Sequence, residues 1–218
     1  MSCVEALGQL RSVEDGNELI MRTISEAVKA YAKALPEGAT LSARECLHLG
    51  ERAAIDQALS RLVKRGDLMR IRRGIFVLPI PSRFGKRPPS VAAVVASLAR
   101  STGERISING ASAANLLGLS TQNPTRYVYW TSGPDRVLTL GAQRVELKHV
   151  PNWKLCASES RAGHAFRALA YIGRVEAGRA LRHIRPQLTD DEWLELLSLR
   201  ANAPLWMAKE FSAFAAAQ

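Results

Sequence analysis

The sequence is poor in cysteine, in aromatic residues and in acidic residues relative to basic ones. Its three cysteines, Cys3, Cys46 and Cys156, are odd in number and widely spaced, which argues against a disulfide framework. No apolar run approaches the roughly 18 residues of a membrane span, so we expect no segment that crosses a membrane. The first residues, MSCVEALGQLRSVEDG, lack the basic flank and the apolar centre of a signal peptide. We therefore expect a cytoplasmic protein.

The sequence also lacks a recognisable set of catalytic or metal-ligating residues. Its four histidines have no ligand-like spacing with one another or with cysteine. The stretch from Gly110 to Gly118 lacks the lysine followed by serine of a phosphate-binding loop. The acidic run Asp190-Asp191-Glu192 stands at an expected helix start, where it complements the helix dipole. We therefore expect no metal, no cofactor and no enzymatic activity.

What the sequence does have is positive charge, and this charge is concentrated. The 218 residues suffice for one large domain or two small ones, and they carry 30 Lys and Arg against 20 Asp and Glu. The segment 44–87 alone contains eleven basic and four acidic residues, a net charge of +7. Such a concentration favours a polyanionic partner, with nucleic acid first and an anionic membrane second. A solvated charged face is the plainer interpretation.

The order of the elements around this segment gives the charge a context. Helical spacing of apolar residues predicts a helix over 19–35, and the Ser-x-x-Glu pattern of 42–45 predicts the start of a short one. A further helix is expected from about residue 52 to a terminating glycine at 66. Residues 68–72 and 75–78, joined by an Arg-Gly turn, predict a β-hairpin. This order is typical of a winged helix-turn-helix.

A winged helix-turn-helix places one helix in the major groove and its hairpin near the phosphate backbone. The Arg-Arg-Gly turn then has a function, because glycine tightens the turn and both arginines project from it. An ordinary surface hairpin with solvated arginines is the alternative. The side chains that we expect to contact DNA are Arg44, Arg52, Gln57, Ser60, Arg61, Lys64, Arg65, Arg70, Arg72, Arg73, Arg83, Lys86 and Arg87.

A proline-rich segment follows, PIPSRFGKRPPS at 79–90. Its prolines predict an extended linker. The segment either lies along the duplex as a basic arm with Phe84 as an anchor, or is a plain linker with solvated cations.

The second half of the chain predicts a mixed domain. The expected helices and strands are 91–100, 111–117, 127–131, 136–140, 143–150, 159–171, 175–184, 190–199 and 204–216. We expect Trp153, Trp193 and Trp206 to be core or interface residues. The predicted fold class is α+β, with an N-terminal winged helix-turn-helix over 1–80, a basic linker over 81–90, and an α/β domain with a helical tail over 91–218.

Two runs of sequence resemble a known family. GERAAIDQALSRLVKRGDLMRIRRGIFVLPIPSRFG and INGASAANLLGLSTQNPTRYVYWTSGP are similar to the AbiEi family of type IV antitoxins, over roughly residues 40–150. The resemblance implies a bacterial DNA-binding antitoxin that represses its own operon. We expect its operator DNA to contain inverted repeats, on which a homodimer can bind. The resemblance also implies that the protein opposes a nucleotidyltransferase-like toxin without forming a stable complex with it. DNA binding would belong to the N-terminal domain, and antitoxicity would draw on the C-terminal one.

Two other functions stay open at this point. One is a winged-helix transcription factor whose C-terminal domain senses a small ligand and which has no toxin partner. The other is a nuclease or transferase that its winged helix recruits to DNA, although the acidic cluster that such chemistry needs is missing.

Overall fold

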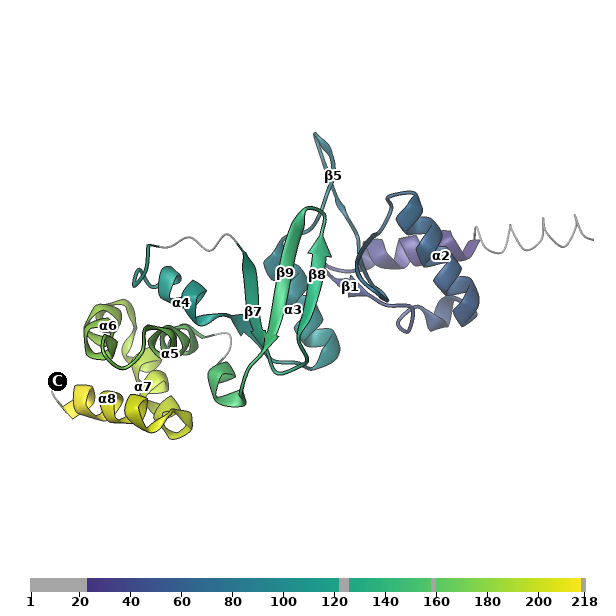
Figure 1. Ribbon diagram of the computed structural model, residues 1–218. Coiled ribbons are helices and arrows are strands. Elements are labelled where there is room, and N and C mark those ends of the chain that lie inside the picture. The colour runs from purple at the N-terminus through teal and green to yellow at the C-terminus, as the bar shows by residue number, and fades with distance from the viewer. Residues whose placement is uncertain (1–22, 122–125, 158–159, 217–218) are drawn as a thin grey trace, which may run out of the picture. The chain divides into compact units, whose positions relative to one another are not determined.

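The computed structural model describes residues 23–121, 126–157 and 160–216 (Figure 1). The predicted helix start at 19–22, Cys3 and Glu159 lie outside the described residues. The fold is α+β, as predicted. The chain forms two compact units, and we describe each by itself. The first contains the described residues up to Ser101 together with Thr139–Gln143, and the second contains Thr102–Leu138 and the described residues from Arg144 onward.

The first unit begins with a helix over residues 23–34, followed by the short strand β1, Thr40–Leu41. A 3₁₀ turn η1, Leu47–Leu49, precedes helix α2, Arg52–Lys64. Strands β2, Met69–Arg72, and β3, Ile75–Val77, then form a hairpin. β3 lies in the centre of an antiparallel sheet of order β1-β3-β2.

One local prediction in this region is wrong. The Ser-x-x-Glu pattern forms its hydrogen bonds, because the Ser42 backbone and hydroxyl both donate to Glu45 Oε2, at 2.6 and 2.7 Å. The segment that follows is a turn and three residues of 3₁₀ helix rather than an α-helix. Gly50 ends it before a second turn can form. The first turn of a helix orders several residues for a single hydrogen bond, so an α-helix this short is unfavourable.

The core of the first unit explains why α2 forms. Its apolar residues Ile55, Ala58, Leu59 and Leu62 recur at helical spacing and are all buried. They pack with Val28 from the first helix, and with the neighbouring buried residues Leu41, Leu68 and Phe76. Burying each large side chain contributes about 1.5–3 kcal/mol, so packing rather than propensity holds α2 in place.

The proline-rich segment is a second hairpin, not an extended linker. β4, Ile80–Ser82, pairs antiparallel with β5, Gly85–Arg87, and only Arg83 and Phe84 form the turn. Proline is tolerated here because a two-stranded ribbon has only edge strands, where a missing N–H costs little.

Helix α3, Val91–Thr102, follows the second hairpin. Ser90 caps it as predicted, since Ser90 Oγ accepts a hydrogen bond from Ala93 N at 3.2 Å. All but its last residue belong to the first unit. Thr40 N donates to Ser97 Oγ at 2.8 Å, and both residues are buried. The domain boundary expected at 90–91 therefore falls inside this unit.

The second half contains a four-stranded sheet of order β6-β7-β9-β8. The strands are β6, Ile106–Ile108; β7, Tyr127–Thr131; β8, Arg136–Leu140; and β9, Gln143–His149. β7 is antiparallel to β6 and parallel to β9. The sequence analysis missed β6, which is only three residues long.

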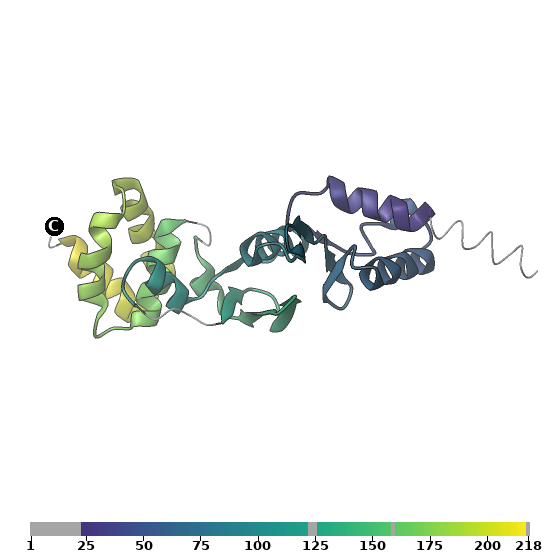
Figure 2. The ribbon, with the colours of Figure 1, turned by 90° about the horizontal axis from the view of Figure 1, so that it is seen from above.

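Helices make up the rest of the second unit. They are α4, Gly110–Leu116; η2, Asn152–Leu155; α5, Arg161–Ile172; α6, Ala177–Ile184; η3, Arg185–Gln187; α7, Asp190–Ser198; η4, Leu199–Asn202; and α8, Leu205–Ala216. Figures 1 and 2 show α5 to α8, coloured green to yellow, gathered into a bundle.

Aromatic side chains fill the core of this bundle. Phe166 and Phe211 are fully buried and stack with their ring centroids 6.2 Å apart. Trp193 is buried, and Trp153 and Trp206 pack against the same cluster, which confirms the predicted core role of these tryptophans. The acidic run at 190–192 lies in the first turn of α7, behind a complete capping box made by Thr189 and Glu192. The cap confirms the structural interpretation of these acids.

Candidate nucleic-acid interface

The outer face of α2 presents polar and basic side chains. Since its inner face is buried, the helical repeat of about 100° per residue directs the intervening positions outward. Arg52, Gln57 and Lys64 are exposed, and Ser60 and Arg61 are partly buried. Arg52 Nε lies 3.0 Å from Asp56 Oδ2, so the positive charge of Arg52 is partly neutralised by a neighbouring carboxylate. The face combines donors, acceptors and positive charge.

The β2–β3 hairpin projects three arginines. A register shift between Arg70 and Arg72 marks a bulge, which twists and re-aims a strand. Gly74 has φ of 75°, a left-handed conformation that tightens the turn without steric cost. Arg72 and Arg73 beside it are exposed. Arg70 is exposed too, and its guanidinium lies 5.4 Å from the centre of the Phe76 ring, which steadies its position.

The β4–β5 hairpin is bound to the C-terminal turn of α2. Lys86 Nζ donates to the Gly66 carbonyl at 2.7 Å and lies 3.0 Å from Asp67 Oδ1. Lys29 Nζ reaches the same carboxylate oxygen at 3.1 Å. These two lysines lower the pKa of Asp67, chiefly through their hydrogen bonds, Lys86 first. The ammonium group of Lys86 is therefore paired within the first unit, while half of its side chain stays exposed.

The other cations of this region are solvent-exposed. Arg83 and Arg87 of the second hairpin, together with Arg44 and Arg65, are exposed. Sequence reasoning missed Lys29 and Asp67, whose roles depend on approaches between residues far apart in the chain. The one signal in the sequence is that Asp67 is the last acid before a stretch, residues 68–103, that contains no Asp or Glu.

All thirteen predicted contact residues lie in the first unit, and eleven of them are exposed. We call this set the basic surface. Cys46 of the same unit is buried and inert, because burial, with a smaller effect from Glu45, raises the pKa of its thiol to about 11. The basic surface suits a polyanion, and its glutamine and serine can also form hydrogen bonds with base edges.

Residues 24–192 match the model of a family of unknown function, DUF6088. The chain belongs to this family. The matched residues include the whole basic surface of this DUF6088 protein. No curated protein matches the chain. A solved structure, the crystal structure of the RV2827C protein from Mycobacterium tuberculosis, is similar at 14% identity and a TM-score of 0.40, over 87% of this chain and 81% of that one.

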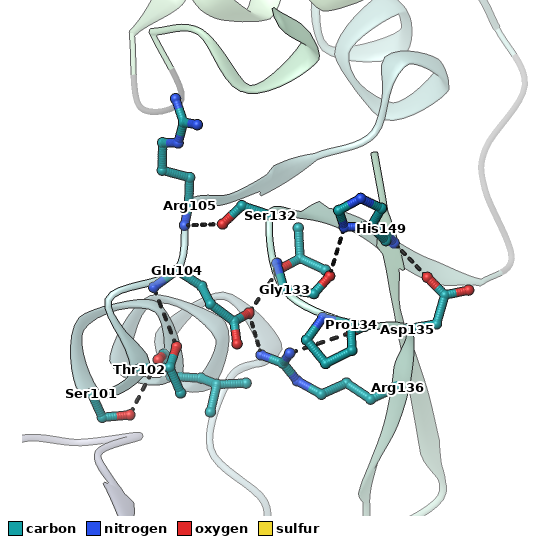
Figure 3. A network of polar contacts seen from close by, with 12 residues as sticks. Ser101, Thr102, Glu104, Arg105, Ser132, Gly133, Pro134, Asp135, Arg136 and His149 are labelled. Carbon is teal, nitrogen blue, oxygen red and sulfur yellow. Dashed lines mark hydrogen bonds and ion pairs between the residues drawn. The ribbon is translucent and has the colours of Figure 1, made fainter. Parts of the chain in front are cut away.

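The second unit of the DUF6088 protein has a polar network at one end of its sheet (Figure 3). Glu104 Oε2 lies 2.6 Å from Arg136 Nη2, and it also accepts a hydrogen bond from Thr131 Oγ1 at 2.7 Å. His149 Nδ1 lies 2.9 Å from the Gly133 carbonyl. Every one of these side chains is engaged with a loop or strand neighbour, so the network orders the loop rather than forming an open site. Within the described part of the chain, no group of histidine, cysteine, aspartate or glutamate side chains is arranged to hold a metal ion.

The second unit also contains a cavity of about 390 Å³ between the loop that follows α4, the end of α5 and helix α6. Gly118, Leu119 and Ile172 line it together with Glu176 and the two basic side chains at its wall, Arg179 and His183. Its volume is within the range of small-molecule sites, roughly 300–1,000 Å³.

Among the described helices, none is long and apolar enough to cross a bilayer.

Proposed function

We propose that this DUF6088 protein is a transcriptional regulator that binds double-stranded DNA through an N-terminal winged helix-turn-helix. The observation that carries the proposal is the basic surface itself. It gathers eleven exposed polar and basic side chains on one helix, its flanking turns and two hairpins of a single unit.

The order of elements in the first unit supports a winged-helix assignment. A helix, a short strand, a 3₁₀ turn, a longer helix and a two-stranded hairpin follow one another, and the first strand pairs with the hairpin. In such a module α2 would enter the major groove, with Gln57 suited to adenine and Arg61 to guanine. Arg72 and Arg73 at the turn would pair with phosphates.

The resemblance to AbiEi antitoxins extends the proposal to biology. On that basis the protein represses its own operon, as a homodimer on inverted repeats, and acts in the cytoplasm without enzymatic activity of its own. It would counteract a nucleotidyltransferase-like toxin without a stable complex, and the second unit would contribute to this antagonism.

A second candidate function rests on the cavity beside α6. A regulator that senses a small ligand needs a pocket of this size with a few polar groups, and Glu176, Arg179 and His183 would supply them. A shift in the melting temperature with a small molecule that binds there, and an operon without a nucleotidyltransferase gene, would favour this alternative.

DNA binding is tested by a titration of duplex DNA at several salt concentrations. The wild type should bind duplex, and Arg72→Ala with Arg73→Ala should weaken binding to specific and random sequences by similar factors. The slope of log K against log salt should fall by roughly 0.9 for each phosphate that is no longer neutralised. The matched control is Arg179→Ala with Arg182→Ala, which removes two exposed cations of α6 in the second unit. Wild-type protein that binds no duplex at low salt would refute the proposal.

A further inference from the structure

The β4–β5 hairpin carries one large apolar side chain at its tip. Phe84 is 86% exposed, and Ser82, Arg83, Lys86 and Arg87 of the same hairpin are polar or basic and exposed. Single exposed apolar residues are common on protein surfaces and need no explanation. Phe84 differs because hydrogen bonds anchor its hairpin to the first unit and because every charged residue of the hairpin is basic.

The hairpin is held by its own turn and by the body of the first unit. Ser82 Oγ donates to the Gly85 carbonyl at 2.6 Å and accepts from Phe84 N at 3.3 Å. Further along, Lys86 fastens β5 to Gly66 and Asp67 at the end of α2. The tip thus stands beyond an anchored base, and Figure 1 shows the ribbon projecting from the unit as a narrow loop.

The charged residues of the hairpin itself are all basic. The guanidinium of Arg83 lies 4.7 Å from the centre of the Phe84 ring, and Arg87 is exposed at the other end of the hairpin. No acidic residue occurs between Asp67 and Glu104. The partner of the tip must therefore combine negative charge with an apolar interior that a single ring can enter.

Duplex DNA combines these properties in its minor groove. Proteins that bind there insert apolar wedges between base steps, and they use arginine and lysine to hold the flanking backbone. The insertion kinks the duplex by about 20–90°. An arginine beside the wedge fits this geometry, because a narrow minor groove has an enhanced negative potential.

We propose that the β4–β5 hairpin inserts Phe84 between base pairs from the minor groove, next to the site occupied by α2, and bends the duplex. The inference rests on the proposed DNA-binding function and adds a second contact to it. Self-association through this tip is disfavoured, since two copies would bring acid-free, basic hairpins together. An anionic membrane offers the right charge, but binding to its surface scales with the apolar area that is buried. Phe84 is the one strongly exposed aromatic side chain of the described part of the first unit, so this area is small.

The test measures bending and affinity on the same full-length protein. The probe is a mixed-sequence duplex with a central TA step, which kinks easily, labelled at both ends for energy transfer. A second copy carries 2-aminopurine beside that step to report unstacking. The variants are Phe84→Ala, the conservative Phe84→Leu, and a control, Val175→Ala, which truncates an apolar side chain that is 94% exposed in the second unit.

The wild type, Phe84→Leu and Val175→Ala should bend the duplex and raise the 2-aminopurine signal. Phe84→Ala should lose most of both signals and bind roughly 5- to 150-fold more weakly, as for the loss of one aromatic–base stack. It should still bind, because α2 and the β2–β3 hairpin are intact. Circular dichroism and melting should match the wild type, since the Phe84 side chain is largely exposed.

Other outcomes overturn the inference. If Phe84→Ala bends DNA like the wild type, or if the wild type binds without bending, the wedge is wrong and the DNA-binding function stands. If Phe84→Ala dissociates a DNA-free dimer, or abolishes binding to phosphatidylserine vesicles, while bending is unchanged, the tip serves a second copy or a membrane. Wild-type protein that binds no duplex at all would remove the proposed function and the wedge together.

Discussion

Asp67 lies between two lysines that come from distant parts of the first unit. Its Oδ1 is 3.1 Å from Lys29 Nζ and 3.0 Å from Lys86 Nζ. One carboxylate thus ties the first helix and the β4–β5 hairpin to the end of α2. It also prevents the two ammonium groups from repelling each other.

Replacing Asp67 with asparagine should therefore loosen the hairpin. The pKa of the carboxyl is lower in the folded protein than its usual value of 3.8. Its contribution to stability is therefore complete above that value and is lost as the pH falls through the lowered pKa. Asp67→Asn should cost about 1 kcal/mol at neutral pH, within the range of partly exposed ion pairs. The difference from the wild type should disappear in acid.

Chemical denaturation at neutral and acid pH measures this effect. Asp56→Asn is the control, because that carboxylate pairs with Arg52 and both partners are exposed. It should lower the free energy of unfolding less than Asp67→Asn does. Equal losses of stability for the two variants would show that the lysine pair adds nothing.

The outer face of α2 should carry the sequence preference. Gln57→Ala with Arg61→Ala should flatten the base preferences recovered from a selection among random duplexes. Each bidentate side chain that is truncated removes about 1–3 kcal/mol of discrimination. Arg61 is partly buried, so the folding of the variant must be checked by its melting temperature. Full retention of the preference by a folded variant would move recognition to the hairpins.

DNA binding and antitoxicity should be separable. On the proposed antitoxin function, Arg72→Ala with Arg73→Ala, supplied in trans, should keep rescuing the growth of cells that express a nucleotidyltransferase-like toxin encoded beside it, although it should no longer repress the operon. Both arginines are exposed, so the variant should fold normally. Loss of rescue by a folded variant would mean that antitoxicity depends on DNA binding.

Gly133 should tolerate no side chain. A Cβ there would clash with the carboxylate of Glu104, which Arg136 and Thr131 hold in place. Gly133→Ala should therefore cost about 1–3 kcal/mol, the usual range for overpacking. Gly178→Ala is the matched control, because no atom lies closer than 3.9 Å to its added Cβ. Inside α6 this change should be neutral or should stabilise by up to about 1 kcal/mol, and chemical denaturation of both variants measures the difference.

Local patterns predicted local structure well. The helix at Arg52–Lys64 follows from apolar residues at helical spacing, and the β2–β3 hairpin from alternation around a glycine turn. The β4–β5 hairpin was not predicted, because proline argues against a strand and only an edge position removes that objection. The placement of α3 was also missed. It depends on contacts such as that of Thr40 with Ser97, 57 positions away, which no local pattern encodes.

The same distinction holds within the basic surface. Exposure of its arginines follows from composition and helical geometry, so most of the surface could be located from the sequence. The engagement of Lys86 with Gly66 and Asp67 follows from how the β4–β5 hairpin packs against the turn after α2, and no spacing rule indicates it. A basic side chain that the sequence predicts to contact a partner can instead pair with groups of the protein itself, as Lys86 does with Asp67.

The first unit takes residues from two separate stretches of the chain, so the backbone passes between the units three times. A single cut or a single recombination junction therefore cannot transfer either unit whole to another protein. A gene fusion that kept only the first stretch would lose Thr139–Gln143. Because each unit is built from two separate stretches of the chain, we expect the two units to be inherited together.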